Sequence, residues 1–415
     1  MQEVLKQVLE RIKPTRKEKR EVKGMIDDFL EKLNKNLKNA KAILGGSGKK
    51  GTWLRGMFDI DLFVLYNYKR YKDKSSELPE LLQPVMEKTF GKLERLHGSR
   101  DYFQIQQGSY TFEIVPILKI DDAEKAVNIT DISPLHARWV LKHKQYQDDI
   151  RLLKQFCRAN RVYGAESYIQ GFSGYICEIL AINYKGFRGV VKAASKWKKG
   201  EVIDVENHYR RKMEVFRELN QSKLVSPIII IDPVQKSRNA AAALSDKKFE
   251  DFRKACGKFF RHPSAEAFRI REIHEDEIRK KAGKGKAVIL KVTPLPGKTD
   301  IVGAKMMKAF DYMANQAERY GFRIKDKGWD WKEGKKALFW FITDKDIENE
   351  FRQEGPPVKA REHAARFRKK HKDIFQEEGR LYAKVKRDYT RLEDFMKHMA
   401  RTDYVEEKTR KVEAV

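Results

Sequence analysis

Two aspartates separated by one residue, Asp59 and Asp61, begin an apolar run that continues to Tyr66. Side chains along a strand alternate between its two faces, so both carboxylates project from the same side, about 7 Å apart. Carboxylates at this spacing can share divalent metal ions. The plainer alternative is a solvated edge strand whose aspartates bind nothing.

A turn of small residues, Gly46 and Ser47, comes shortly before these aspartates. The backbone N–H groups of such a turn, together with the serine hydroxyl, form a cradle for an anion. We expect the turn to follow a short strand over 42–44 and to lead into helical turns over 50–55. An anion cradle beside metal-binding carboxylates predicts chemistry on phosphates, whereas the turn alone would have only a structural role.

A third carboxylate, Glu113, is expected to complete the group. The stretches 102–107 and 110–118 predict a β-hairpin, and the second of them carries this single acid. Its chain neighbours Phe112 and Ile114 are apolar, and burying a carboxylate among them is costly unless a metal or a cation neutralises it. Otherwise Glu113 faces solvent on a half-exposed strand.

The combined pattern resembles the nucleotidyltransferase superfamily signature. It consists of Gly46-Ser47, a short helix, Asp59-x-Asp61 and a third acid. In detail the chain resembles the archaeal (class I) CCA-adding enzymes, the tRNA nucleotidyltransferases that build the 3′ CCA end. This resemblance extends over nearly the whole chain. One departure is that the third acid of the family is usually Asp followed by Val-Val-Pro. Further motifs that carry the resemblance are Gly51-Thr52-Trp53-Leu54, Leu152-Leu153-Lys154-Gln155-Phe156, Tyr163-Gly164 and Gly171-Phe172-Ser173-Gly174-Tyr175-Ile176-Cys177-Glu178.

The resemblance implies a catalytic and triphosphate-binding set. Two Mg²⁺ ions would be held by Asp59, Asp61 and Glu113, with CTP and ATP as substrates. Lys154 and Tyr163 would donate to the triphosphate and to the leaving pyrophosphate. Without the family, Lys154 would be read as a solvated lysine, Tyr163 as a core tyrosine, and His136 as a packing or solvent-facing residue. The remaining residues implied to hold the triphosphate are Gly46, Ser47, Lys50 and His136.

The resemblance also implies a base-selecting arginine, Arg238, within an Asp-Pro-Val…Arg-Asn motif that begins at Asp232. Cytosine and adenine each present a ring nitrogen that accepts a hydrogen bond, where uracil and guanine present an N–H. A guanidinium only donates, so it favours C and A. We expect Asp232 to hold Arg238 or to cap the turn; without the family, the two would be a plain ion pair.

The charge of the chain predicts a polyanionic partner. Lysine and arginine outnumber aspartate and glutamate by 88 to 60, for a formal net charge of +28. A salt-adapted or thermophilic surface would carry more closely matched signs, so we favour binding to an RNA backbone. The three cysteines are expected to be buried thiols. A charged N-terminus and the lack of a bilayer-spanning apolar run predict a cytoplasmic location without a membrane partner.

With 415 residues, the chain is expected to fold as an α+β multidomain protein. We predict a catalytic head over 1–145, a nucleotidyltransferase-type mixed sheet with flanking helices. A helical nucleotide-recognition domain follows over 146–257. A tRNA-binding body and tail over 258–415 would contain a small α/β domain of the ferredoxin/RRM-like kind. The finer predictions are helices over 81–96, 132–143, 240–260 and 301–320, strands over 227–234, 287–293, 322–331 and 336–343, and a frayed end over 404–415.

A basic helix over 359–372 predicts where the acceptor end of tRNA and its adjoining helix are bound. The alternative is a solvated basic face. The sequence leaves the oligomeric state open, with a homodimer as one option. The six residues assigned to RNA binding are Arg361, Arg366, Arg368, Lys369, Lys370 and Lys372.

Two other functions fit parts of the pattern. A related transferase could add poly(A) or make oligoadenylates with the same head. A non-catalytic RNA-binding protein could retain the head as a relic, although a relic has no reason to keep costly clustered carboxylates.

Overall fold

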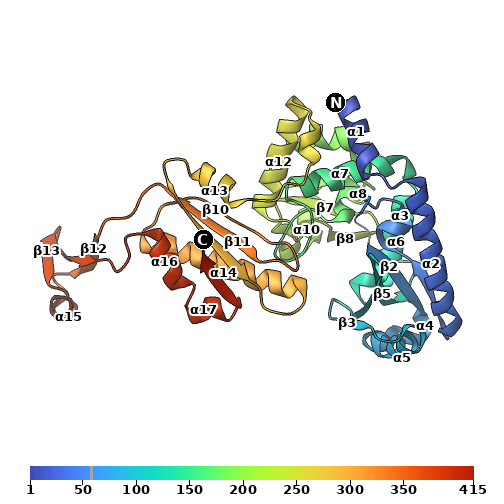
Figure 1. Cartoon of the computed structure of the whole chain (residues 1–415), viewed down its shortest axis with the longest axis horizontal. Coiled ribbons are helices and arrows are strands. Elements are labelled where there is room, and N and C mark those ends of the chain that lie inside the picture. The colour runs from blue at the N-terminus through green and yellow to red at the C-terminus, as the bar shows by residue number, and fades with distance from the viewer. Residues whose placement is uncertain (57–58) are drawn as a thin grey trace. The chain divides into compact units, whose positions relative to one another are not determined.

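The computed structural model describes residues 1–56 and 59–415. Met57 and Phe58, which fall within the predicted signature stretch, lie outside the described residues. The chain divides into two compact units, Met1–Arg271 and Glu272–Val415 (Figure 1). Across the described ranges, no helix is both long and apolar enough to cross a membrane.

A five-stranded mixed sheet forms the first part of unit 1. Its strand order is β1-β2-β5-β4-β3, with β2 and β5 parallel and the other pairs antiparallel. The predicted mixed sheet and the hairpin of β4 and β5 are therefore confirmed. The strands are β1 Ala40–Leu44, β2 Asp59–Asn67, β3 Glu94–Leu96, β4 Tyr102–Gln107 and β5 Tyr110–Lys119.

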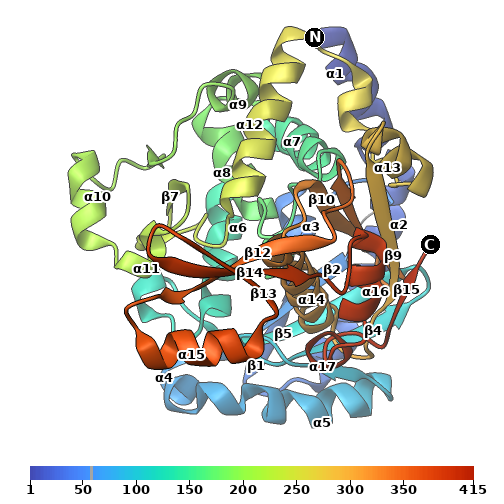
Figure 2. The ribbon, with the colours of Figure 1, turned by 90° about the vertical axis from the view of Figure 1, so that its left-hand side faces the viewer.

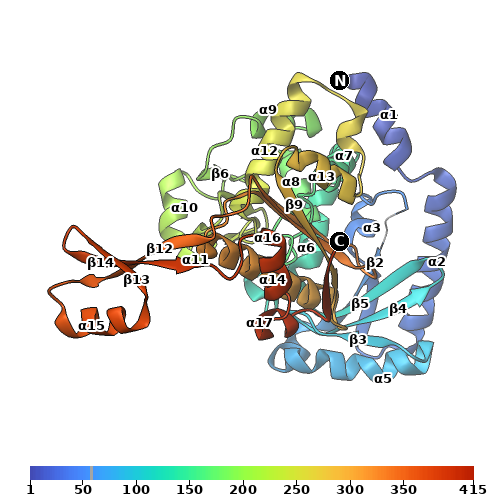
Figure 3. The ribbon, with the colours of Figure 1, turned by 60° about the vertical axis from the view of Figure 1, so that its left-hand side comes forward.

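Helices α2 (Arg16–Asn36) and α5 (Leu78–Phe90) pack against this sheet (Figure 3). The ring of Phe29 on α2 stacks between Phe90 and Phe112, with ring centroids 4.1 and 4.3 Å away. The predicted helix over 81–96 ends early, at Phe90, because Gly91 takes a positive φ of 78° and the chain then turns into β3.

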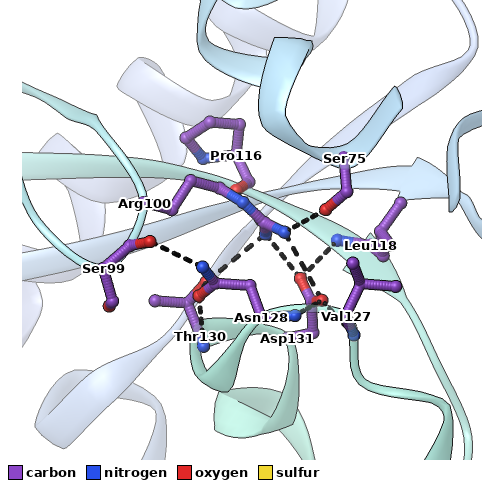
Figure 4. A network of polar contacts seen from close by, with 9 residues as sticks. All are labelled: Ser75, Ser99, Arg100, Pro116, Leu118, Val127, Asn128, Thr130 and Asp131. Carbon is purple, nitrogen blue, oxygen red and sulfur yellow. Dashed lines mark hydrogen bonds and ion pairs between the residues drawn. The ribbon is translucent and has the colours of Figure 1, made fainter. Parts of the chain in front are cut away.

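A buried arginine–aspartate pair fixes the far end of β5 (Figure 4). Arg100 donates to Asp131 Oδ1 at 2.5 Å and to the carbonyl oxygen of Pro116 at 3.0 Å. The same carboxylate accepts from the Leu118 N–H at 2.9 Å. Because a buried charge is tolerated only with such partners, the pair holds the strand that carries Glu113.

A second core in unit 1 is built mainly from helices. Phe156, Phe172, Phe187, Phe252 and Phe259 are buried in it. Helix α1 lies within the predicted head but contributes Leu5 and Val8 to this helical core. Its main helices are α1 Gln2–Ile12, α7 Gln147–Ala159, α8 Gly174–Asn183, α9 Phe187–Ala194 and α12 Asp246–Arg261.

The helix predicted over 240–260 begins later than expected, at Asp246. Arg238 and Asn239 belong to strand β8 (Gln235–Asn239), which pairs with β7 (Ile228–Asp232). The Asn239 Oδ1 accepts from the Ile230 and Ala241 N–H groups, which keeps this segment in the sheet region. The remaining elements here are β6 Glu201–Ile203, α10 Lys212–Glu218 and α11 Gln221–Leu224.

Unit 2 contains a four-stranded sheet of order β10-β11-β9-β15. The predicted strand–helix–strand–strand order is confirmed, and with α16 and β15 it becomes a β-α-β-β-α-β arrangement. The expected frayed end is wrong, because β15 pairs with β9. The ranges are β9 Lys286–Thr293, α14 Thr299–Tyr320, β10 Ile324–Asp330, β11 Ala337–Thr343, α16 Leu392–Met399, α17 Asp403–Glu406 and β15 Lys411–Ala414.

Helices cover both faces of that sheet. Met306 and Phe310 of α14 and Phe395 of α16 pack on one face. Ile278 of α13 (Glu275–Ala282) packs on the other face against Ile289.

An inserted three-stranded sheet, of order β12-β14-β13, carries the basic helix α15 (Arg361–Lys370) (Figure 2). Its strands are β12 Glu350–Pro357, β13 Asp373–Glu377 and β14 Arg380–Lys386. The predicted boundary at 257/258 falls inside α12, and the three-domain division stays a prediction.

Candidate active site

The parallel pairing of β2 and β5 brings the acids together. Asp61 is the register partner of Glu113, and Asp59 is the partner of Thr111 two positions earlier. Burial of Asp61, followed by the charges of Glu113 and Asp59, raises its pKa to about 7, although Lys50 acts in the opposite direction. The expected side-by-side placement of carboxylates is thus present for Asp61 and Glu113.

The carboxylates supply the oxygen ligands that magnesium prefers. Glu113 accepts from the Gln104 Nε2 at 2.9 Å. Within the described part of the chain, no three His, Cys, Asp or Glu side chains are gathered as a metal site. Burial and, after it, the charges of Glu113 and Asp59 raise the pKa of Asp61, and a divalent cation would offset both effects, so the donors fit such an ion. The three-acid metal site stays a prediction.

The glycine turn lies directly against Asp61. A Cβ on Gly46 would come within 1.6 Å of Asp61 Oδ2, and Gly46 has a φ of +50°. The Gly45 N–H donates to the Asp61 carbonyl oxygen at 2.8 Å. The helical turns predicted over 50–55 form earlier, as α3 (Gly46–Lys50), and end at Gly51. Only glycine allows the backbone at position 46 to lie this close to Asp61. Ser47, in the first turn of α3, therefore follows directly after this contact.

A buried carboxylate that the sequence reading passed over, Glu178, holds the two predicted lysines. Lys50 Nζ donates to its Oε2 at 2.7 Å and Lys154 Nζ to its Oε1 at 3.0 Å. Burial opposes its ionisation, but Lys154 and Lys50 outweigh burial and lower the pKa of Glu178 to about 2. The argument applied to Glu113, an acid amid apolar neighbours, could have identified Glu178.

The loop after α3 is fixed by the neighbouring helices. Arg151 donates to the carbonyl oxygens of Gly51 and Trp53, and Gln147 donates to that of Lys50. Thr52 Oγ1 donates to Glu178 at 3.0 Å. The position of Lys50 is therefore fixed by contacts with α7 and α8 as well as by its own helix.

Tyr163 reaches the same place from a different element. A Cβ on Gly174, at the start of α8, would lie 3.0 Å from the Tyr163 hydroxyl and 3.5 Å from Lys154 Nζ. Burial raises the pKa of Tyr163, so the phenol stays a hydrogen-bond donor at neutral pH. The structure therefore brings Tyr163 and Lys154 together, as the predicted set requires.

A second buried cluster centres on Asp232. Arg238 Nη1 donates to its Oδ2 at 2.6 Å, and the Val234 N–H donates to its Oδ1 at 3.0 Å. The predicted ion pair and turn cap are both confirmed. Burial opposes ionisation, but His136 and Arg238 outweigh it and lower the pKa of Asp232 to about 2.

His136 and Tyr175 complete this cluster. The His136 Nε2 lies 3.0 Å from Asp232 Oδ2, and its ring stacks on Tyr175 with centroids 4.0 Å apart. The Tyr175 hydroxyl donates to Asp232 Oδ1 at 3.1 Å. Lys50 Nζ lies 5.3 Å from the Tyr175 ring centroid, which joins the two clusters. Tyr175 belongs to a predicted motif, but the sequence alone predicts no role for its side chain.

The six residues predicted to bind RNA belong to unit 2. Five of them lie on α15 and Lys372 follows it. All six side chains are exposed, and none forms an ion pair with a residue in the described ranges. Their binding role stays a prediction.

Sequence models of three protein families match successive parts of the chain. The nucleotidyltransferase domain matches residues 26–161. The second domain of tRNA nucleotidyltransferase matches residues 148–269, and the C-terminal domain of CCA-adding enzyme matches residues 289–409.

Curated relatives match over nearly the full length. The chain is 34% identical over 385 residues to the CCA-adding enzyme of Nanoarchaeum equitans, covering 92% of this chain and 93% of that one. It is 32% identical over 397 residues to the CCA-adding enzyme of Sulfolobus acidocaldarius, covering 94% and 89%.

Among solved structures, the fold is similar to that of a cytoplasmic RNA terminal U-transferase. The TM-score is 0.50 at 14% identity, over 66% of this chain and 100% of that chain. A second structure, of an RNA terminal uridylyl transferase, has a TM-score of 0.51 at 14% identity over the same shares. At this identity the likeness concerns the fold alone.

Proposed function

Because the chain belongs to the family of CCA-adding enzymes, we propose that it adds C, C and A to the 3′ end of tRNA. The reaction takes CTP and ATP, uses no nucleic-acid template and releases pyrophosphate. The observation that carries this proposal is the placement of Asp61 beside Glu113 and against the Gly46 turn. This arrangement sets carboxylates and an anion cradle at one place.

Asp59, Asp61 and Glu113 are the residues that would hold two Mg²⁺ ions. Bound divalent ions lower the pKa of the attacking 3′-hydroxyl and offset charge on the phosphates. The glutamate at 113 is one methylene longer than the usual aspartate, and Gln104 restrains it through its hydrogen bond. This bond comes from β4, on the side of β5 opposite to β2, and it fixes one oxygen of the Glu113 carboxylate.

In this proposal the triphosphate is bound by Gly46, Ser47, Lys50, His136, Lys154 and Tyr163. Glu178 holds both ammonium groups in place, because its two oxygens each accept from one lysine. The lysines and the phenol donate to the phosphates, and these bonds strengthen as negative charge develops on the leaving pyrophosphate.

Arg238 selects the base in this proposal. Asp232 is fully buried and ionised, so it fixes the guanidinium through Oδ2, which His136 also contacts, while Tyr175 donates to Oδ1. A donor-only group held this firmly favours cytosine and adenine over uracil and guanine.

The basic residues of α15 and Lys372 contact the tRNA backbone in this proposal, in the acceptor end or its adjoining helix. A cytoplasmic location belongs to the same proposal. The full-length relatives favour CCA addition over a poly(A)-type transferase or a non-catalytic RNA-binding protein.

The test is addition of single nucleotides to end-trimmed tRNA, followed by sequencing of the products. We expect CTP alone to add two residues and stop, ATP alone to add almost nothing, and both together to complete CCA. A chelator should abolish all addition. Long tracts of A from ATP alone would identify a poly(A)-type enzyme, and no addition under any condition would leave only RNA binding.

A further inference from the structure

A cavity of about 510 Å³ opens on unit 1, on the face of β2 that carries the acids. Phe63 and Leu65 line it and follow Asp59 and Asp61 at alternate positions of the strand. Ala137 of α6 (Ser133–Leu141) lines another side. No residue of the predicted catalytic or nucleotide-binding set lines this cavity, although Gly45, which bonds to Asp61, does, so the cavity adjoins the candidate site.

The size and lining suit a small molecule. Pockets that bind small ligands typically hold about 300–1,000 Å³ and combine an apolar lining with a few polar groups. Here the floor is apolar, formed by Ile43, Phe63 and Leu65 from the sheet and by Ala137 and Leu141 from α6. An apolar ligand body would gain free energy by leaving water for this floor.

The rim of the cavity is cationic. Its exposed lysines and arginine outnumber its single acid, Asp121. Lys125 pairs with Asp121 at 2.7 Å. Among the described residues, no carboxylate forms an ion pair with the other rim cations, which are Lys49, Lys69, Lys119 and Arg138.

We propose that this cavity binds a small amphipathic anion. The compact apolar body would lie on the floor, and a phosphate, sulfonate or carboxylate would be bound by the rim. Charge complementarity favours an anion over a neutral apolar molecule, because four of the five rim cations form no ion pair with any described residue that the ligand would have to displace. The apolar floor favours a small molecule over an RNA backbone, which needs only the charge.

The test uses two fluorescent probes with the same aromatic framework, in titrations of the full chain. The probe 1-anilinonaphthalene-8-sulfonate carries an anion, and N-phenyl-1-naphthylamine is its neutral counterpart. We expect saturable binding of the sulfonate with one site per chain, about tenfold tighter than binding of the neutral probe at low salt.

Two variants locate the probe. Lys69→Ala/Lys119→Ala removes two exposed rim cations and should weaken the sulfonate about tenfold while leaving the neutral probe unchanged. Its matched control is Lys88→Ala/Lys92→Ala, which removes two exposed lysines outside the cavity. Leu65→Trp should abolish binding of both probes by filling the floor; thermal unfolding checks its fold.

Three results would overturn the proposal. One is equal affinity for both probes, and another is an equal loss of sulfonate binding in the rim variant and in its control. The third is displacement of the sulfonate by tRNA together with weaker tRNA binding in Lys69→Ala/Lys119→Ala, which would assign the rim to RNA. The lysine variants keep the test decisive should Leu65→Trp fail to fold.

Discussion

At the scale of single residues, the site is organised by two buried carboxylates that bind no substrate in our account. Glu178 positions Lys50 and Lys154, and Asp232 positions Arg238. Both pKa values are lowered to about 2 because neighbouring cations outweigh the cost of burial. The two carboxylates therefore stay charged across the physiological pH range.

The pKa of Glu178 predicts a dependence of stability on pH. A pKa lowered from 4.5 to about 2 means that its contribution is complete above pH 4.5 and is lost as the pH falls toward 2. We expect Glu178→Gln to cost on the order of 1–3 kcal/mol at pH 7 and to flatten the fall of stability below pH 4.5. Urea unfolding across this range measures both.

The exposed Glu10 provides the control, since Glu10→Gln should leave the unfolding free energy nearly unchanged. An unaltered pH profile in Glu178→Gln would show that the lysines do not depend on this carboxylate.

Arg238 predicts an effect on fidelity. Arg238→Ala should raise the ratio of UTP to CTP incorporation about tenfold or more, because one charged hydrogen bond to the base is lost. The rate with CTP should fall less than the discrimination does. Competition between CTP and UTP on trimmed tRNA measures the ratio, and unchanged selection would remove Arg238 from the base site.

At the scale of elements, the decisive contact is between α3 and β2. The strands that carry the acids could be predicted from the sequence, because the alternation of side chains along β2 and β5 places the acids on one face of the sheet. The start of α3 could not be predicted, since it depends on Gly46 lying against Asp61, a contact between segments. The late start of α12 was missed for a similar reason: Asn239 bonds to Ile230 across the sheet and holds the chain extended.

The contact between Gly46 and Asp61 can be tested with one methyl group. Gly46→Ala places a Cβ onto Asp61 at a positive φ, so we expect a loss on the order of 1–3 kcal/mol in stability and a severe loss of nucleotide addition. Gly24→Ala is the matched control, because nothing lies within 4 Å of its Cβ and α2 should gain a few tenths of a kcal/mol or more. Equal behaviour of the two variants would contradict the close approach.

At the scale of the whole molecule, the composition alone shows the excess of basic residues, 88 against 60 acidic ones. This excess predicts an RNA partner. The division at 271/272 was not readable, because residues 265–268 fold back onto the helical core through Phe268. Composition shows no boundary there, and only the packing reveals it.

Charge on α15 should control tRNA affinity through salt. Arg366→Ala/Lys369→Ala removes two exposed cations, so the slope of log affinity against log salt should fall by roughly 1.5–2. Lys88→Ala/Lys92→Ala should leave the slope unchanged. Filter binding or fluorescence anisotropy from low to moderate salt measures the slope. Equal slopes in both variants would show that the basic residues of α15 are merely solvated and do not bind tRNA.

The most direct test of the central claim compares catalysis and binding in Asp61→Asn, which keeps the shape of the side chain and removes its charge. We predict that the variant loses addition of CTP to end-trimmed tRNA by about a thousandfold or more at saturating Mg²⁺, while its tRNA affinity stays within about twofold of the native protein. Retained addition, or a loss of tRNA affinity as large as the loss of addition, would contradict a catalytic role for Asp61.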